Sequence, residues 1–99
     1  MWYALISQDI ESSLPLRKIH RPAHIERLKQ LHQEGRLLIA GPHPAQDTAE
    51  PNEAGFTGGL VVAEFDSLNE AKDWANSDPY FLNGVYQSVT VKPFIKALP

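Results

Sequence analysis

The sequence contains no cysteine and only one methionine among its 99 residues. Without cysteine the chain can form no disulfide framework, no thiolate nucleophile and no sulfur-based zinc or iron–sulfur site. Long hydrophobic runs are also missing, since the apolar stretch at the N-terminus is interrupted by Gln8 and Asp9 and has no basic flank. Such a short stretch predicts neither a signal peptide nor a membrane span. We therefore expect a cytoplasmic protein that makes no membrane contact.

An excess of positive charge is absent as well. Nine Lys and Arg residues oppose twelve Asp and Glu residues, which gives a net charge of −3. No segment concentrates the basic residues that bind phosphates, so we expect no nucleic-acid partner. What remains is typical of a globular chain, with 42% hydrophobic and 21% charged residues. The length predicts one domain that occupies residues 1–99.

The order of the predicted elements indicates an α+β fold. Segments with the composition of strands occupy residues 2–7, 36–40, 58–65 and 86–94. One helix is expected to begin at Pro22 and to stop at Gly35. A second is expected to follow the cap residue Ser67 and to end by Asp78, because Pro79 comes next. The resulting βαββαβ order predicts the ferredoxin-like arrangement, in which two helices cover one face of a four-stranded antiparallel sheet.

Two further segments are less regular. Residues 11–20 are ambiguous, because Ser12 and Ser13 can cap a helix and Pro15 is tolerated in a first turn. Residues 41–56 contain three prolines and two glycines and predict a long loop. Loops of that length in small domains are often functional, so we expect this one to set ligand choice.

The predicted strands are hydrophobic on both faces. In the first strand, for example, Tyr3 and Leu5 point to one face while Ala4 and Ile6 point to the other. An antiparallel strand with one solvated face would alternate between hydrophobic and polar residues. Because the two helices cover only one face, we expect the other to pack against a second copy of the chain. The predicted assembly is a homodimer or a larger even oligomer.

The directions of the strands and helices bring several polar residues to one edge of the predicted sheet. His24, near the start of the first helix, and Asp78, at the end of the second, meet there. A histidine oriented by a carboxylate is a general acid or base near neutral pH, and a nearby arginine suits a carboxylate, enolate or phenolate. We expect His24 and Asp78 to be catalytic. Possible substrate-binding residues near the same edge are Arg21, Asp9, Gly41, Pro42 and Tyr80.

These candidates also have plain structural interpretations. A histidine within an apolar helix stripe often only packs, and Asp78 could simply end its helix. His32, on the same stripe, is expected to fill the core or an interface. His20 and His24 have the spacing of metal ligands on a helix, but Pro22 argues against one helical turn through both, so no metal is expected. No nucleotide-binding motif is present, and we expect no cofactor.

Several short segments match a known pattern when taken together: ALISQD (4–9), Arg17, RPAH (21–24), EGRLL (34–38), AGP (40–42), AGFTG (54–58), DPY (78–80), GVY (84–86) and VKPF (91–94). In combination they resemble the YciI (YCII-related) family of small bacterial proteins over nearly the whole chain. The resemblance implies a ferredoxin-like fold of the dimeric α/β-barrel group, related to muconolactone isomerases. It also implies an active site centred on a histidine and an aspartate, which correspond to His24 and Asp78. His20 and His43 lie outside this pattern.

Two classes of function remain open. The leading hypothesis is a small enzyme of the lyase or isomerase type, which moves a proton on a cyclic or unsaturated organic acid or phenol. His24 would be the acid or base, Asp78 its orienting partner and Arg21 an anion clamp. The alternative is a non-catalytic domain that binds a small ligand or serves dimerisation, with His24 as a packing residue.

Overall fold

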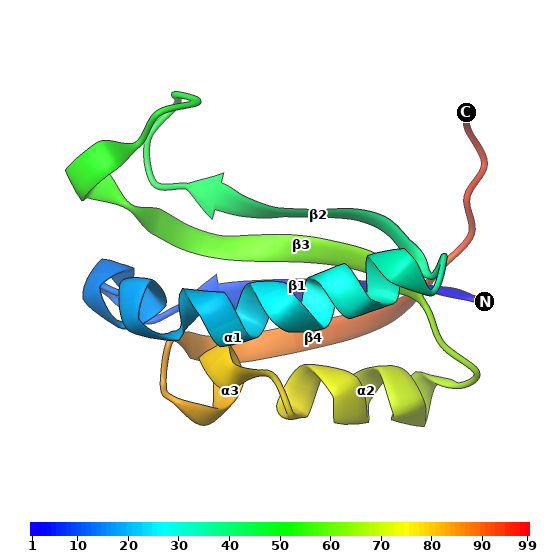
Figure 1. Cartoon of the computed structure of the whole chain (residues 1–99). Helices are drawn as coiled ribbons and strands as arrows, with labels where there is room; N and C mark the ends of the chain where they lie inside the picture. Colours follow the sequence, from blue (N-terminus) through cyan, green and yellow to red (C-terminus); the bar gives the residue numbers. More distant parts are fainter.

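Four antiparallel strands form one sheet in the order β2-β3-β1-β4 (Figure 1). The computed structural model describes residues 1–99. Its elements follow in the order β1 (Trp2–Asp9), α1 (Leu14–Gln33), β2 (Leu37–Pro44), a short 3₁₀ helix η1 (Asn52–Ala54), β3 (Phe56–Glu64), α2 (Leu68–Asn76), α3 (Pro79–Leu82) and β4 (Tyr86–Phe94). The predicted α+β class and βαββαβ order are confirmed, and the four-residue helix α3 is an addition that the sequence pattern did not reveal.

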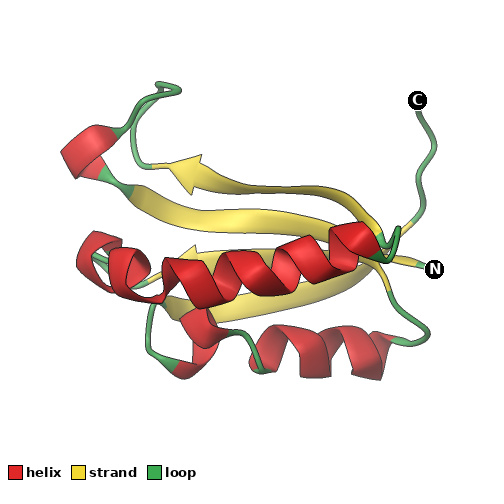
Figure 2. Ribbon diagram, viewed as in Figure 1, coloured by secondary structure: helices red, strands yellow, loops and turns green.

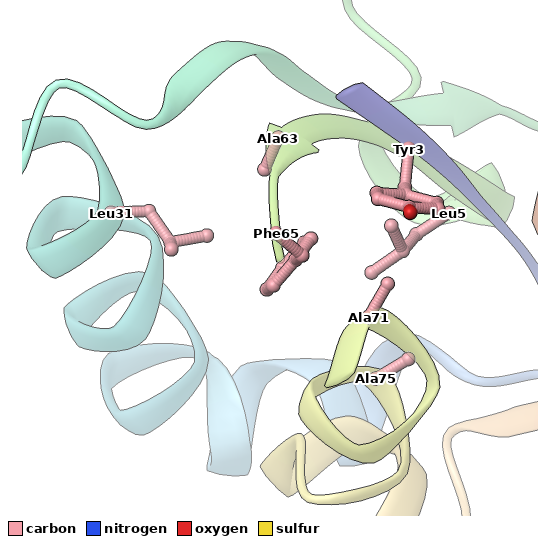
Figure 3. Packing of buried hydrophobic residues seen from close by; sticks show 7 residues of the cluster. All are labelled: Tyr3, Leu5, Leu31, Ala63, Phe65, Ala71 and Ala75. Atoms are coloured by element: carbon pink, nitrogen blue, oxygen red, sulfur yellow. The ribbon is translucent and has the colours of Figure 1, made fainter. Parts of the chain in front are cut away.

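The two long helices, α1 and α2, pack on the same face of the sheet. The buried core combines residues of both helices with residues of β1 and the end of β3: Tyr3, Leu5, Leu31, Ala63, Phe65, Ala71 and Ala75 (Figure 3). Side chains alternate along a strand, so the intervening β1 residues Ala4 and Ile6 point to the opposite face. No helix lies on that face of the sheet (Figure 2). The sheet therefore has one covered face, as predicted, and one face without a helix.

Helix α1 begins earlier than the sequence pattern indicated. It starts at Leu14 and contains Pro22 in its interior, so the expected start at Pro22 was wrong. Pro15 occupies the first turn, where a backbone N–H has no partner within the helix. Pro22 and Lys18, four residues before it, are both exposed, so water can satisfy the Lys18 carbonyl that loses its helical partner. Neither α1 nor any other helix has the length and apolar composition that a membrane span requires.

Strand β2 extends further than expected, through Pro44, and includes Gly41 and Pro42. The sequence predicts a long loop over residues 41–56, but the loop covers only residues 45–55 and contains η1. Prolines are tolerated because β2 is an edge strand and pairs on one side only. The connection from β2 to β3 extends away from the end of the sheet (Figure 1). Gly41 and Pro42 are thus held on the sheet itself.

Candidate active site

A cavity of about 440 Å³ lies between α1 and the covered face of the sheet. Its walls come from α1, from β1, β2 and β3, and from the segment that leads from α2 through α3 into β4. Hydrophobic residues make up 13 of the 22 that line it. A volume of this order suits a small organic molecule, and the composition of the wall favours one with an apolar body.

His24 of α1 and Asp78 form a direct pair at this cavity. The imidazole Nδ1 lies 2.8 and 3.0 Å from the two carboxylate oxygens of Asp78. Because a carboxylate only accepts, Nδ1 carries the proton in this bond. In the neutral ring Nε2 is then an acceptor, and it has no hydrogen-bond partner within the protein. The His24 side chain is 12% exposed and lines the cavity, so its second nitrogen is available to a ligand.

The Asp78 carboxylate is fixed by two further donors. It caps α3 by accepting a hydrogen bond from the backbone N–H of Tyr80 at 2.9 Å, and it accepts another from Nη1 of Arg27 at 3.1 Å. The Arg27 guanidinium also donates to the backbone carbonyl of Trp74, and its central carbon lies 4.1 Å from the centre of the Trp74 side-chain ring. Asp78 therefore orients His24 and also caps α3, a helix that the sequence pattern did not reveal.

Two tyrosines complete the wall next to His24. The ring of Tyr80 stacks on the imidazole, with centroids 4.0 Å apart and planes 11° from parallel, and Tyr86 contacts Tyr80 edge to face. Burial raises the pKa of Tyr80, and burial also raises the pKa of Tyr86 above its usual value. Both hydroxyls therefore remain protonated near neutral pH and can donate hydrogen bonds. Neither tyrosine is poised to act as a base there.

Asp9 lies behind the cavity wall instead of lining it. Its carboxylate accepts hydrogen bonds from Nε and Nη2 of Arg17 at 2.6 and 3.1 Å. It also accepts one from the Ser13 hydroxyl at 2.6 Å. The first turn of α1, which the sequence pattern had not placed there, covers the carboxylate, and the Asp9 side chain is 0% exposed. The structure thus makes Asp9 the holder of Arg17 and does not bring it to the ligand cavity as predicted.

The other four predicted binding residues border the cavity, whereas most of the predicted loop does not. Arg21, Gly41, Pro42 and Tyr80 all line the cavity, and Arg21 is exposed and makes no hydrogen bond within the protein. Residues 43–55, in the region expected to set ligand choice, do not line it. His32 is exposed, contrary to a core position within one chain. His20 and His24 do share a continuous helix, but no three His, Asp or Glu side chains lie close enough together to hold a metal ion.

Sequence reasoning missed the roles of Arg17 and Arg27. Arg17 precedes His24 by seven residues, about two helical turns, and so lies on the same side of α1. That spacing is visible in the sequence, but it carries meaning only if the helix begins at Leu14. Arg27 follows His24 by three residues, which also places it on a neighbouring position of the helix surface.

The chain is thus a small α+β protein in which a histidine–aspartate pair opens into a mostly hydrophobic cavity. It belongs to the YCII-related domain family, whose pattern matches residues 1–95. It is 55% identical to Protein YciI of Escherichia coli O6:H1 and of Shigella flexneri, over 97% of this chain and 98% of each relative. An uncharacterized protein of Haemophilus influenzae is 54% identical over the same shares of the two chains.

A solved structure shares the fold over nearly the full chain. It is 5-chloro-2-hydroxyhydroquinone dehydrochlorinase (TftG) from Burkholderia phenoliruptrix AC1100, in complex with 2,5-dihydroxybenzoquinone. The TM-score is 0.85, with 22% sequence identity, and the match covers 98% of this chain and 96% of the other. The similarity shows a common architecture.

Proposed function

We propose that the protein is an enzyme of the lyase or isomerase type that transfers a proton on a cyclic or unsaturated organic acid or phenol. The observation that carries this proposal is the bond from His24 Nδ1 to Asp78 at 2.8 Å, which leaves Nε2 as the available nitrogen at the cavity. As a base, Nε2 takes a proton from a carbon or hydroxyl of the substrate. In an isomerisation the imidazolium then returns that proton to a different substrate atom. In an elimination the electron pair of the broken bond to hydrogen expels the leaving group, and the imidazolium gives the proton to that group or to water.

Asp78 and Tyr80 support the charged form of His24 during this transfer. The carboxylate accepts Nδ1–H in both protonation states, and the stacked Tyr80 ring presents its face to the cation. Since the same imidazole both accepts and releases the proton, we propose that this chemistry needs no cofactor. We propose Arg21, Gly41, Pro42 and Tyr80 as direct substrate contacts, and Asp9 as an indirect one through Arg17.

The solved structure that shares this fold suggests which compounds to test first as substrates. TftG is a dehydrochlorinase of a chlorinated hydroxyhydroquinone, and its complex holds a dihydroxybenzoquinone. The cavity of this chain, with about 440 Å³ and a largely hydrophobic wall, is of a size that accepts a single substituted ring. We therefore propose hydroxylated aromatic compounds and unsaturated lactone acids as the first substrates to test.

The test is proton exchange from these compounds in D₂O, followed by ¹H NMR, because exchange reveals proton transfer even where no net product forms. Wild type should exchange at least one carbon-bound proton of an active compound, and His24→Ala should abolish this. His32→Ala is the matched control, since it removes an exposed histidine of the same helix that does not line the cavity. Equal exchange in wild type and His24→Ala would contradict the proposal. Saturable binding without exchange would favour the ligand-binding alternative.

We also propose that the helix-free face of the sheet binds a second copy of the chain. The pairings of β1 and β2 with β3 place Ile6, Leu60 and Ile39 together on this face, beside the buried Val62. Ile39 is 57% exposed and Ile6 39% exposed in the single chain, which leaves large hydrophobic groups in water. The same face on two chains related by a two-fold axis would cover both sets at once.

Sedimentation of two charge variants tests this assembly. Leu60→Lys places a charge on the helix-free face and should convert a dimer into monomers at low micromolar concentration. Ile19→Lys changes a residue of α1 that is 67% exposed and should leave the assembly intact. Leu5 is unsuitable for this purpose, since it lies in the core under the helices. A folded wild-type monomer at these concentrations would contradict the proposal.

A further inference from the structure

Arg17 presents an unpaired donor to the cavity from a buried position. Its Nε and Nη2 donate to Asp9, and Nη2 also donates to the carbonyl of Gly58 at 3.1 Å. Nη1 has no hydrogen-bond partner in the protein, although the side chain is only 9% exposed. No fully enclosed side-chain nitrogen or oxygen lacks a partner, so Nη1 is not sealed inside the wall. Arg17 lines the cavity, and a ligand there can accept from Nη1.

The guanidinium is held rigidly in that position. Its central carbon lies 5.0 Å from the ring centre of Phe56 and 5.0 Å from that of Tyr80. Asp9 contacts two of its nitrogens, and the Tyr80 hydroxyl donates to the Arg17 backbone carbonyl at 3.3 Å. A planar group fixed on its edge and beside two aromatic rings loses little conformational freedom when it binds a ligand. This preorganisation favours recognition over mere packing.

We propose that Arg17 Nη1 is the anion-recognition group of the cavity and binds an oxyanion, a carboxylate or phenolate, on a ring-shaped ligand. Tyr80 contacts both Arg17 and His24, so a single ring lying along this wall could place its oxyanion at Nη1 and another atom near Nε2 of His24. Lys18 and Arg21 also line the cavity, which adds to the positive potential there. The position of the reacting atom near His24 rests on the proposed function. The binding of the oxyanion depends only on the geometry of Arg17.

Arg21 is the competing candidate and is less suited to this role. It lines the cavity, but its side chain is exposed and no hydrogen bond fixes it. A flexible exposed arginine loses side-chain entropy on binding, and its charge is screened by water. Arg17 has neither disadvantage, because its position is set before the ligand arrives.

The experiment compares benzoate with its neutral isostere benzamide as probes, by NMR titration of the full-length protein. Wild type should bind benzoate about tenfold or more tightly than benzamide, as expected for a charge-assisted hydrogen bond in a shielded site. The double variant Asp9→Asn with Arg17→Gln removes both charges and avoids leaving one of them buried alone. It should lose the preference for the anion. Arg36→Gln, an exposed arginine away from the cavity, should retain it.

A second variant keeps the proposal testable if the double variant does not fold. Arg17→Lys preserves the charge beside Asp9, but one ammonium cannot reproduce the planar fork that serves Asp9 and the cavity together. Its preference for benzoate should also fall by about tenfold. Absence of any preference in wild type would overturn the proposal. So would its loss in Arg21→Gln combined with its persistence in Arg17→Lys.

The two proposals can fail separately. If no compound exchanges protons in a His24-dependent way but the preference for benzoate depends on Arg17, the proposed reaction is rejected and the proposed anion-binding role of Arg17 is retained. If His24-dependent exchange is found but the preference for benzoate does not depend on Arg17, only the proposed anion-binding role of Arg17 is rejected.

Discussion

Two aspartates bind cations along α1, and they differ in what those cations can do. Asp9, at the end of β1, holds Arg17, whose charge is permanent. Asp78, at the start of α3, holds His24, whose charge can change, together with Arg27. The first pair is a fixed support for the cavity wall. The second pair can bind and release a proton where a ligand would lie.

The difference follows from burial and from the chemistry of the cation. The Asp9 side chain is completely covered and receives three donors within the protein, which leaves it no contact with the cavity. Asp78 is nearly as buried, but its histidine partner reaches the cavity through the second ring nitrogen. Asp9 therefore fixes the buried guanidinium of Arg17, whereas Asp78 positions a histidine at the cavity.

The largest effect is expected from removing the first carboxylate. Asp9→Ala leaves the Arg17 guanidinium buried without its counter-charge, and should lower the free energy of unfolding by about 3–5 kcal/mol. Urea denaturation near pH 7 measures this. The matched control is Glu34→Ala, which breaks the exposed pair with Arg36 and should cost no more than about 1 kcal/mol. Similar losses in the two variants would show that the Asp9 pair is not the support described above.

The second carboxylate should matter for turnover. With an active substrate, His24→Ala and Asp78→Asn should each lower kcat by about 100-fold or more while the protein stays folded. Because both act through one imidazole, the double variant should be little worse than His24→Ala alone. Single-turnover kinetics on the three variants measures this. If the losses multiply, Asp78 contributes independently of His24 and the pair is not a unit.

The contrast also shows how far the sequence could lead. His24 and Asp78 were predictable, because strand and helix directions bring them to one edge and the family resemblance names them. Arg17 was not, because its position depends on the turns of α1 before Pro22, and a proline in a helix is a poor indicator of whether the helix continues past it. Arg27 was hidden for another reason. A charged residue on a helix is usually solvated, and its contact with Asp78 joins residues 51 positions apart.

The βαββαβ order could also be predicted from the sequence, since each strand has the hydrophobic composition of a covered sheet. The extension of β2 through Pro42 and Pro44 was not, because prolines suit an edge strand as readily as a loop. The sequence alone therefore leaves open whether Gly41 and Pro42 belong to a loop or to the sheet that forms the cavity wall.

A smaller effect is expected at alkaline pH, where the tyrosines beside His24 titrate. Burial raises the pKa of Tyr80 and of Tyr86, whereas phenols of the unfolded chain ionise near pH 10. The stabilisation by the protonated phenols is therefore complete below about pH 10 and is lost as the pH rises through the folded-state pKa values. Thermal unfolding between pH 8 and 11 should show Tm falling above pH 10. Tyr86→Phe should reduce that slope, and an unchanged slope would mean that Tyr86 is not shielded.

The smallest effect is expected from Ser13, which contributes one of the three donors to Asp9. Ser13→Ala removes that hydroxyl, but the two bonds from Arg17 at 2.6 and 3.1 Å remain and keep the charges paired. The free energy of unfolding should fall by about 1 kcal/mol, the typical value for a single hydrogen bond. Because the guanidinium stays in place, the preference for benzoate over benzamide should change by less than about twofold. Urea denaturation and the same NMR titration measure the two quantities. A loss of stability as large as that of Asp9→Ala would mean that the hydroxyl, and not Arg17, is what makes the buried carboxylate tolerable.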